Sequence, residues 1–311
     1  MKKDVLYTLP SPYREDLKVT GYRFGSGKKS ACIVGAIRGN EIQQLYVCSQ
    51  LVKKLTELEE QGAIVSDHEI LVIPSVGHHS MNIGKRFWTV DNTDINRMFP
   101  GYDQGETTQR IAAGVFESVK DYDYGIQFAS FYLPGDFVPH VRMMDTGFQN
   151  TSLANLFGLP YVVIRKARPI DTTTLNYNWQ LWETNAFSVY TSKTDMIDEK
   201  SARQAVGAVL RFLTRMGILR YNSHSGYIAT IIAEEDLAVV KTNAGGIYRR
   251  LRFAGEEVCM GEPLAVITHP YDGSITSTIL SPTNGVIFFS HEKPLVTENE
   301  IVYKIIKRLH N

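Results

Sequence analysis

Cysteine is scarce in this sequence. Of 311 residues only three are cysteines, Cys32, Cys48 and Cys259, and they lie far apart with no Cys-x-x-Cys pair. An odd number of widely separated cysteines argues against a disulfide framework and against a zinc site built from thiolates. We therefore expect the protein to work in the reducing cytoplasm.

The sequence also lacks an excess of charge of either sign and any long apolar run. Lys and Arg total 33, as do Asp and Glu, so nothing favours nucleic acid or an anionic membrane as a partner. No apolar run approaches the roughly 20 residues of a membrane-spanning helix, and the two lysines near the N-terminus are not followed by the apolar core of a signal peptide. Gly-x-Ser-x-Gly, Walker and dinucleotide-binding motifs are missing too, which argues against a serine hydrolase and a nucleotide-binding protein.

One stretch that is present, residues 30–41 (SACIVGAIRGNE), organises the first part of the chain. Residues 31–34 form the continuous apolar run of a strand that is buried on both faces. A turn at 38–40 follows, and a long helix then begins at Glu41, with Asn40 as its expected N-cap. This order places Glu41 at the carboxyl end of a strand, where ligands bind in open α/β sheets.

Strands and helices alternate over the first two thirds of the chain. We expect strands at 17–25, 30–37, 69–74, 122–130, 138–143, 161–166 and 186–192, and helices at 40–61, 107–120, 173–184 and 198–217. This alternation predicts an α/β domain with a mostly parallel sheet over residues 1–219. Residues 220–311 show short strands separated by Gly and Pro turn signals, which predicts a small all-β domain.

Three segments resemble the succinylglutamate desuccinylase/aspartoacylase family. Residues 35–41 are similar to its Gly-x-x-His-Gly-Asn-Glu motif, residues 94–101 (DINRMFPG) to its Asp-Leu-Asn-Arg-x-Phe-Pro-Gly signature, and residues 84–87 (GKRF) to its Gly-x-Arg-Phe. The resemblance implies a zinc-carboxypeptidase-like α/β domain of three layers with a mostly parallel mixed sheet. It also implies a C-terminal β-domain of the biotinyl/lipoyl-like kind.

The resemblance implies three zinc ligands, of which this chain keeps one. Arg38 stands where the family has its first His, Glu41 is retained, and Ala129 aligns with the second His. A catalytic zinc needs three protein ligands and a water, so Glu41 alone does not hold it. We expect a degraded metal site in which the permanently charged guanidinium of Arg38 pairs with Glu41 in place of zinc. No cofactor is then expected.

The general base of the family is also replaced, because its Glu aligns with Ser192. A serine hydroxyl cannot take a proton from a metal-bound water unless another base assists it. The nearest acids in the sequence are Glu183 and Asp195.

The residues that hold the substrate carboxylate in the family are retained as Arg86, Asn96 and Arg97, and Arg142 matches a further arginine near the substrate. A guanidinium can hold a carboxylate through two parallel charge-assisted hydrogen bonds. The alternative is that Arg86 and Arg97 pair with nearby acids such as Asp91 and Asp94.

Three histidines are candidates for replacement metal ligands beside Glu41. His78 and His79 follow a strand, and His140 lies near Arg142. If 78–79 is an extended loop, the two adjacent rings point to opposite sides, and at most one faces the site.

The sequence favours a pseudoenzyme that binds a small-molecule carboxylate, an acylated amino acid or a peptide end without zinc chemistry. The alternative is an active hydrolase that cleaves the amide bond of an N-acylated amino acid with zinc in a rearranged site. A third interpretation is different chemistry with Lys193, Tyr190 or His140 as acid or base. The sequence leaves open whether the chain is an enzyme, and it is compatible with a homo-oligomer.

Overall fold

The computed structural model describes residues 1–308. The chain forms two compact units. The first contains Met1–Ser130 and Pro139–Ile231, and the second contains Phe131–Val138 and the chain from Ile232 onward. In this structure the division therefore falls at residue 231 rather than near 219, and a short segment from the middle of the chain belongs to the second unit.

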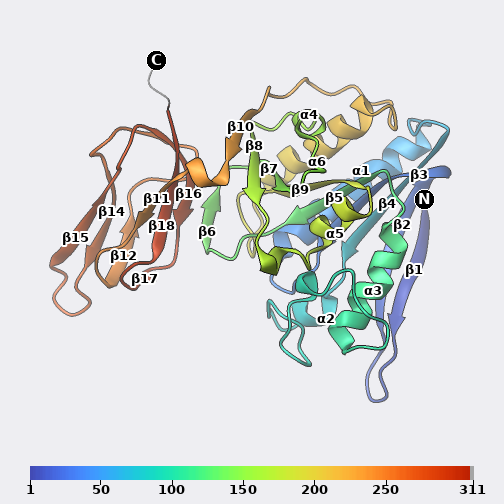
Figure 1. Cartoon of the computed structure of the whole chain (residues 1–311), viewed down its shortest axis with the longest axis horizontal. Coiled ribbons are helices and arrows are strands. Elements are labelled where there is room, and N and C mark those ends of the chain that lie inside the picture. The colour runs from blue at the N-terminus through green and yellow to red at the C-terminus, as the bar shows by residue number, and fades with distance from the viewer. Residues whose placement is uncertain (309–311) are drawn as a thin grey trace. The chain divides into compact units, whose positions relative to one another are not determined.

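The first unit is built on a mixed sheet of nine strands in the order β1-β2-β4-β3-β5-β9-β7-β8-β10 (Figure 1). The central pairs β4–β3, β3–β5 and β5–β9 are parallel, whereas β1–β2, β2–β4 and β7–β9 are antiparallel. The strands are β1 (Lys2–Leu9), β2 (Leu17–Gly25), β3 (Gly27–Ala36), β4 (Asp67–Ser75), β5 (Tyr124–Ala129), β7 (His140–Asp145), β8 (Tyr161–Lys166), β9 (Asn185–Tyr190) and β10 (Thr230–Ala233).

Helices cover both faces of this sheet, and β3 contributes apolar side chains to the core on each face. Ala31 and Ile33 pack in one core with α1 (Ile42–Glu60) and α6 (Glu199–Arg215). Cys32 and Val34 point to the opposite face and pack with α3 (Thr107–Val119) and α5 (Leu175–Leu181). The alternation of side chains along a strand thus produces the three expected layers.

The expected strands and the four long helices are all present, with ends that differ by a few residues. The sequence pattern does not predict β1, which pairs with β2 at the sheet edge. The pattern also does not predict the short helices α2 (His78–Met81), α4 (Thr151–Asn155), η1 (Ile95–Arg97) and η2 (Pro169–Asp171). Such short elements contain too few residues to show helical periodicity.

The second unit is formed by strands apart from one short 3₁₀ helix, η3 (Glu234–Asp236). One sheet has the order β11-β18-β16-β13, with β6 also paired to β16, and the other has the order β15-β14-β12-β17. Side chains from both sheets share an apolar core. The strands are β6 (Gly135–Phe137), β11 (Ala238–Lys241), β12 (Gly246–Arg250), β13 (Glu257–Val258), β14 (Pro263–Thr268), β15 (Ile275–Leu280), β16 (Gly285–His291), β17 (Leu295–Val296) and β18 (Ile301–Lys307).

Over residues 1–308, no helix is both long enough and apolar enough to cross a membrane.

Candidate functional site

The turn after β3 folds back on the carboxylate of Glu41. Oε2 of Glu41 accepts hydrogen bonds from the backbone N–H groups of Ile37 (2.8 Å) and Arg38 (2.9 Å), and the Glu41 side chain has no exposed surface. Gly39 is required because a Cβ there would lie 2.2 Å from the carbonyl oxygen of Lys85. The expectation that Asn40 caps α1 is wrong. Glu41 occupies the N-cap position, and its carboxylate turns toward the strand end and makes no cap hydrogen bond.

The guanidinium of Arg38 lies between two buried carboxylates. Its Nη1 donates to Oε1 of Glu41 at 3.0 Å. Its Nε lies 2.9 Å from Oδ1 of Asp94, and its Nη2 lies 3.0 Å from Oδ2. All three side chains are at least nine-tenths buried. The expected pairing of Arg38 with Glu41 is therefore present, and Asp94 adds a bidentate contact from a distant part of the chain.

The other carboxylate oxygen of Glu41, Oε1, also bonds a residue at the end of β5, the strand that pairs with β3. Ser130 directly follows β5, and its hydroxyl donates to Oε1 of Glu41. Ala129, the last residue of β5, presents only a methyl group, and its carbonyl oxygen accepts from Gln44 Nε2 at 3.2 Å. The parallel pairing of β3 with β5 brings these two strand ends together.

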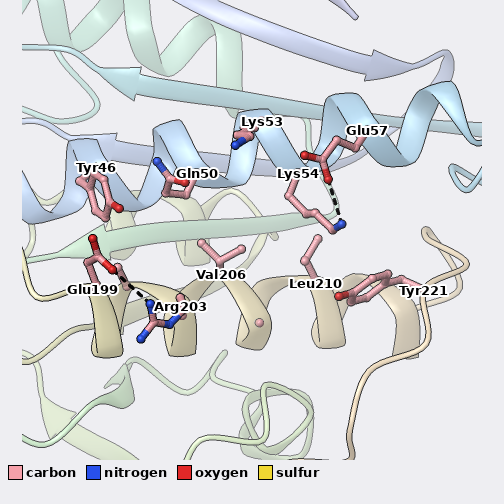
Figure 2. Close-up of a pocket in the computed structure, with 12 residues that line it drawn as sticks. Tyr46, Gln50, Lys53, Lys54, Glu57, Glu199, Arg203, Val206, Leu210 and Tyr221 are labelled. Carbon is pink, nitrogen blue, oxygen red and sulfur yellow. Dashed lines mark hydrogen bonds and ion pairs between the residues drawn. The ribbon is translucent and has the colours of Figure 1, made fainter.

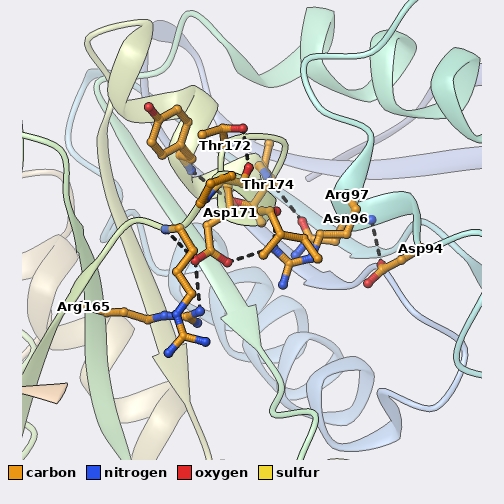
Figure 3. Close-up of polar contacts among 12 residues, drawn as sticks. Asp94, Asn96, Arg97, Arg165, Asp171, Thr172 and Thr174 are labelled. Atoms are coloured by element: carbon orange, nitrogen blue, oxygen red, sulfur yellow. Dashed lines mark hydrogen bonds and ion pairs between the residues drawn. The ribbon is translucent and has the colours of Figure 1, made fainter. Parts of the chain in front are cut away.

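Asp171 holds Arg97 in a separate cluster. Nη1 of Arg97 donates to Asp171 Oδ1 at 2.9 Å and to the carbonyl oxygen of Ile170 at 2.6 Å, while Arg165 Nη2 lies 2.9 Å from Asp171 Oδ2 (Figure 3). Asn96, on the same 3₁₀ turn as Arg97, accepts from the backbone N–H of Leu175 at 3.3 Å. Two arginines thus bond the same buried carboxylate.

Asp91 and Asp94, the nearby acids of the alternative interpretation, bond several other residues. Asp94 bonds Arg38, Asp91 accepts from Thr93 and Thr108, and Arg97 bonds Asp171. The side chain of Arg86 lies 3.5 Å from Asn40 Oδ1, and its carbonyl oxygen accepts from Gly39. Arg86 thus borders the turn that carries Arg38.

Three further residues surround the end of β9. Tyr190 is opposite both Ala129 of β5 and His140 of β7 in the sheet register. The His140 ring stacks on Tyr190 with centroids 4.8 Å apart, and the Arg142 guanidinium lies 4.6 Å from the Tyr190 ring centre with Nη1 3.3 Å from its hydroxyl. The antiparallel β7–β9 pair therefore places Arg142 and His140 along the same part of the sheet as Ala129.

Ser192, which the resemblance aligns with the base of the family, contacts an acid other than Glu183 and Asp195. Its hydroxyl donates to Asp198, the N-cap of α6, and lies 2.8 Å from the hydroxyl of Ser201. Although burial raises the pKa of Asp198, hydrogen bonds from Ser192 and Ser201 and from the N–H groups of Lys200 and Ser201 outweigh this effect and lower the pKa. Asp198 lies six residues after Ser192, and no spacing rule singles it out.

His78 and His79 lie on helix α2, so the assumption of an extended loop is wrong. The two rings meet edge to face, with centroids 4.7 Å apart, and His79 stacks on Trp88. Burial lowers the pKa of both imidazoles, so both are neutral at pH 7.

A family model for the succinylglutamate desuccinylase/aspartoacylase catalytic domain matches residues 27–216. The chain belongs to this family. None of the curated proteins matches it in sequence.

Solved structures of the desuccinylase/aspartoacylase family have the same fold. A family structure from Rhodobacter sphaeroides superposes with a TM-score of 0.80 at 19% identity, covering 97% of this chain and 95% of that one. A succinylglutamate desuccinylase from Silicibacter sp. TM1040 gives 0.83 at 18% identity, with 98% and 95% covered. The product-bound ectoine utilization protein EutE of Ruegeria pomeroyi gives 0.80 at 18% identity, with 98% and 94% covered.

The resemblance aligns three residues with the metal ligands of the family: Glu41 offers a carboxylate, Arg38 a guanidinium and Ala129 a methyl group. The carboxylate of Glu41 is already bonded by Arg38 and Ser130. Within residues 1–308, no three His, Cys, Asp or Glu side chains gather closely enough to hold a metal ion. His78, His79 and His140 thus form no such group with Glu41. This donor set does not fit the tetrahedral zinc site of an amide hydrolase.

Proposed function

We propose that this member of the family binds a small molecule or peptide end through its carboxylate and does not hydrolyse it with zinc. The observation that carries the proposal is the position of the Arg38 guanidinium, which bonds both Glu41 and Asp94. A guanidinium stays protonated and has no lone pair to give to a metal. The guanidinium would therefore repel a divalent cation bound beside Glu41.

The ligand class follows from the charges that surround the retained signature. Arg97 and Arg165 both bond the carboxylate of Asp171, so two guanidinium groups lie close together beside the retained signature. Arg142 presents another guanidinium beside Tyr190. An anion with planar geometry, such as a carboxylate, would match the guanidinium forks of these arginines. We accordingly propose Arg86, Asn96, Arg97 and Arg142 as ligand-binding residues.

A second candidate is a hydrolase that cleaves the amide bond of an N-acylated amino acid by a rearranged mechanism. One observation favours it: the hydrogen bond between Ser192 and Asp198 brings a carboxylate to the position of the family base. A metal centre would still have to displace Arg38 from Glu41. We also infer that the second unit is a structural domain of the biotinyl/lipoyl-like kind.

Metal content separates the two candidates. The protein is purified without chelator, dialysed against equimolar zinc and analysed by plasma mass spectrometry. We expect zinc at background level, and stoichiometric zinc would overturn the proposal and lead to a screen of acyl amino acids for hydrolysis.

Ligand binding is tested separately by thermal shift with N-acetylaspartate and N-acetylglutamate. We expect at least one of them to raise the melting temperature of the wild-type protein but not that of Arg97→Met. Arg249→Met, which removes an exposed arginine of β12, is the matched control and should respond like the wild type. If neither compound stabilises the wild type, or if they stabilise Arg97→Met equally, the assigned carboxylate site is wrong.

A further inference from the structure

Arg211 of α6 is a buried cation without a carboxylate partner. Its side chain is 5% exposed, its Nε donates to the carbonyl oxygen of His224 at 2.9 Å, and its Nη1 donates to that of Phe157. No carboxylate within residues 1–308 lies at ion-pair distance, and no hydrogen bond there leaves its Nη2. Carbonyl dipoles satisfy part of the guanidinium, but they do not neutralise its charge.

The next turn of α6 increases this uncompensated charge. Arg215 is also held by carbonyl oxygens alone, those of Leu156 (2.7 Å) and Ser225 (2.6 Å). Burial and the positive charge of Arg215 together lower the pKa of Arg211. Two cations four residues apart on one helix face repel each other, so a bound anion would be stabilised here.

Arg211 lines a cavity of about 210 Å³ whose other walls suit an anion. The lining includes Arg203, Gln204, His224 and Tyr227 and contains no aspartate or glutamate. Nδ1 of His224 accepts the N–H of Gly226 at 3.1 Å, so a neutral ring carries its proton on Nε2 and can donate. Every polar side chain of the cavity can therefore donate a hydrogen bond.

The cavity is separate from the turn that holds Arg38 and also from a neighbouring groove. That groove, of about 530 Å³, lies between α1 and α6 and is lined by both acids and bases (Figure 2). Two of its pairs of opposite charge are Lys54 with Glu57 and Arg203 with Glu199. Acids thus accompany the bases of the groove, whereas none of the described residues that line the cavity beside Arg211 is an acid.

We propose that the cavity beside Arg211 is a second ligand site that binds an oxyanion, the phosphate or carboxylate group of a small molecule. The anion supplies the missing counter-charge to Arg211, and Gln204, His224 and Tyr227 offer additional donors. The cavity volume admits a ligand of a few heavy atoms, such as inorganic phosphate or succinate.

The test introduces a negative charge into the cavity wall by mutation, so that a bound anion is no longer needed to compensate Arg211. Gln204→Glu places a carboxylate in the cavity wall with almost no change of shape. Gln50→Glu makes the same change on α1, in the neighbouring groove and outside the cavity. Binding of inorganic phosphate and of succinate is measured by isothermal titration calorimetry at constant ionic strength, with chloride as the reference anion.

We expect saturable binding of at least one of the two oxyanions to the wild type. Gln204→Glu should weaken it at least tenfold, whereas Gln50→Glu should leave it within twofold. The relative affinity of phosphate and succinate then identifies the class of ligand. Failure of both anions to bind the wild type, or equal weakening in both variants, would overturn the proposal. The proposed function is unaffected by either result because Arg97 lies outside this cavity, and binding should persist in Arg97→Met.

Discussion

Arg38 donates two hydrogen bonds to the carboxylate of Asp94, a residue 56 positions later in the chain. Asp94 is also the N-cap of η1, where it accepts the N–H of Asn96 at 3.0 Å. One carboxylate therefore links the turn after β3 to the segment that carries Asn96 and Arg97. In this chain, a buried ion-pair network joins the turn that holds Glu41 to the segment at residues 94–101.

Removal of Arg38 should be costly. In Arg38→Met, Glu41 and Asp94 remain buried without their shared cation, and loss of one partner from a buried ion pair costs about 3–5 kcal/mol. We expect a loss of this size in the free energy of unfolding in urea. Arg203→Met breaks an exposed i,i+4 pair with Glu199 and should cost less than about 0.5 kcal/mol. Similar losses in both variants would mean that Glu41 and Asp94 do not depend on Arg38.

Restoring the two family histidines should restore metal binding. In the double variant Arg38→His/Ala129→His, Glu41 is released from the guanidinium and three donors surround the strand ends. We expect close to one zinc per chain by plasma mass spectrometry, compared with background for the wild type and for either single variant. If the wild type already binds as much zinc as the double variant, Arg38 does not block the site.

Asp171 should contribute more to stability than an exposed acid of equal charge. Asp171→Asn leaves Arg97 and Arg165 without their shared carboxylate in a nearly inaccessible position, which should lower the free energy of unfolding by about 3 kcal/mol. The control is Asp121→Asn, which loses only an exposed pair with Lys29, and we expect less than about 1 kcal/mol. An equal effect of the two substitutions would contradict a structural role for the cluster.

Two helix glycines should respond in opposite directions to alanine. A Cβ at Gly207 of α6 meets nothing within 4 Å, so Gly207→Ala should stabilise the protein by about 0.5–1 kcal/mol through helix propensity. A Cβ at Gly114 of α3 would lie 2.0 Å from the Tyr7 ring, so Gly114→Ala should destabilise it. Thermal unfolding shows whether each variant is more or less stable than the wild type. A melting temperature of Gly207→Ala below that of the wild type would mean that a Cβ is not accommodated at this position.

The second unit should lose stability in mild acid because of His291. This residue has no exposed surface, and burial lowers its pKa despite the nearby Glu300, whose Oε1 lies 3.9 Å from Nε2. Because the unfolded chain takes up a proton near pH 6.5 and the folded state does not, stability is full above that pH and falls as the pH drops toward the folded pKa. Hydrogen exchange of β16 and β18 amides should therefore accelerate between pH 7 and pH 5 beyond the intrinsic pH effect. His291→Gln should remove this extra dependence, and an unchanged dependence in that variant would assign it to another group.

Local sequence patterns were sufficient to predict most of the elements of the first unit. The run at 31–34 is apolar at every position, which indicated a central strand, and β3 lies in the middle of the sheet. The α2 helix was missed because four residues with two histidines carry no such period. The β6 strand was missed because its pairing with β16 joins distant segments.

The sequence by itself determined the segments that resemble the family and the strand–turn–helix at Glu41, and it predicts that Arg38, Ala129 and Ser192 stand at the metal-ligand and base positions of the family. These features depend on residue type at fixed local spacing, so they can be read along the chain. Only the tertiary structure decided the partners of the charged groups: Asp94 for Arg38, Asp171 for Arg97 at a separation of 74 residues, and, within residues 1–308, no acid for Arg211. The physical reason is that a buried charge must be compensated by whichever group the packed elements bring within a few ångströms, and sequence distance does not determine that group.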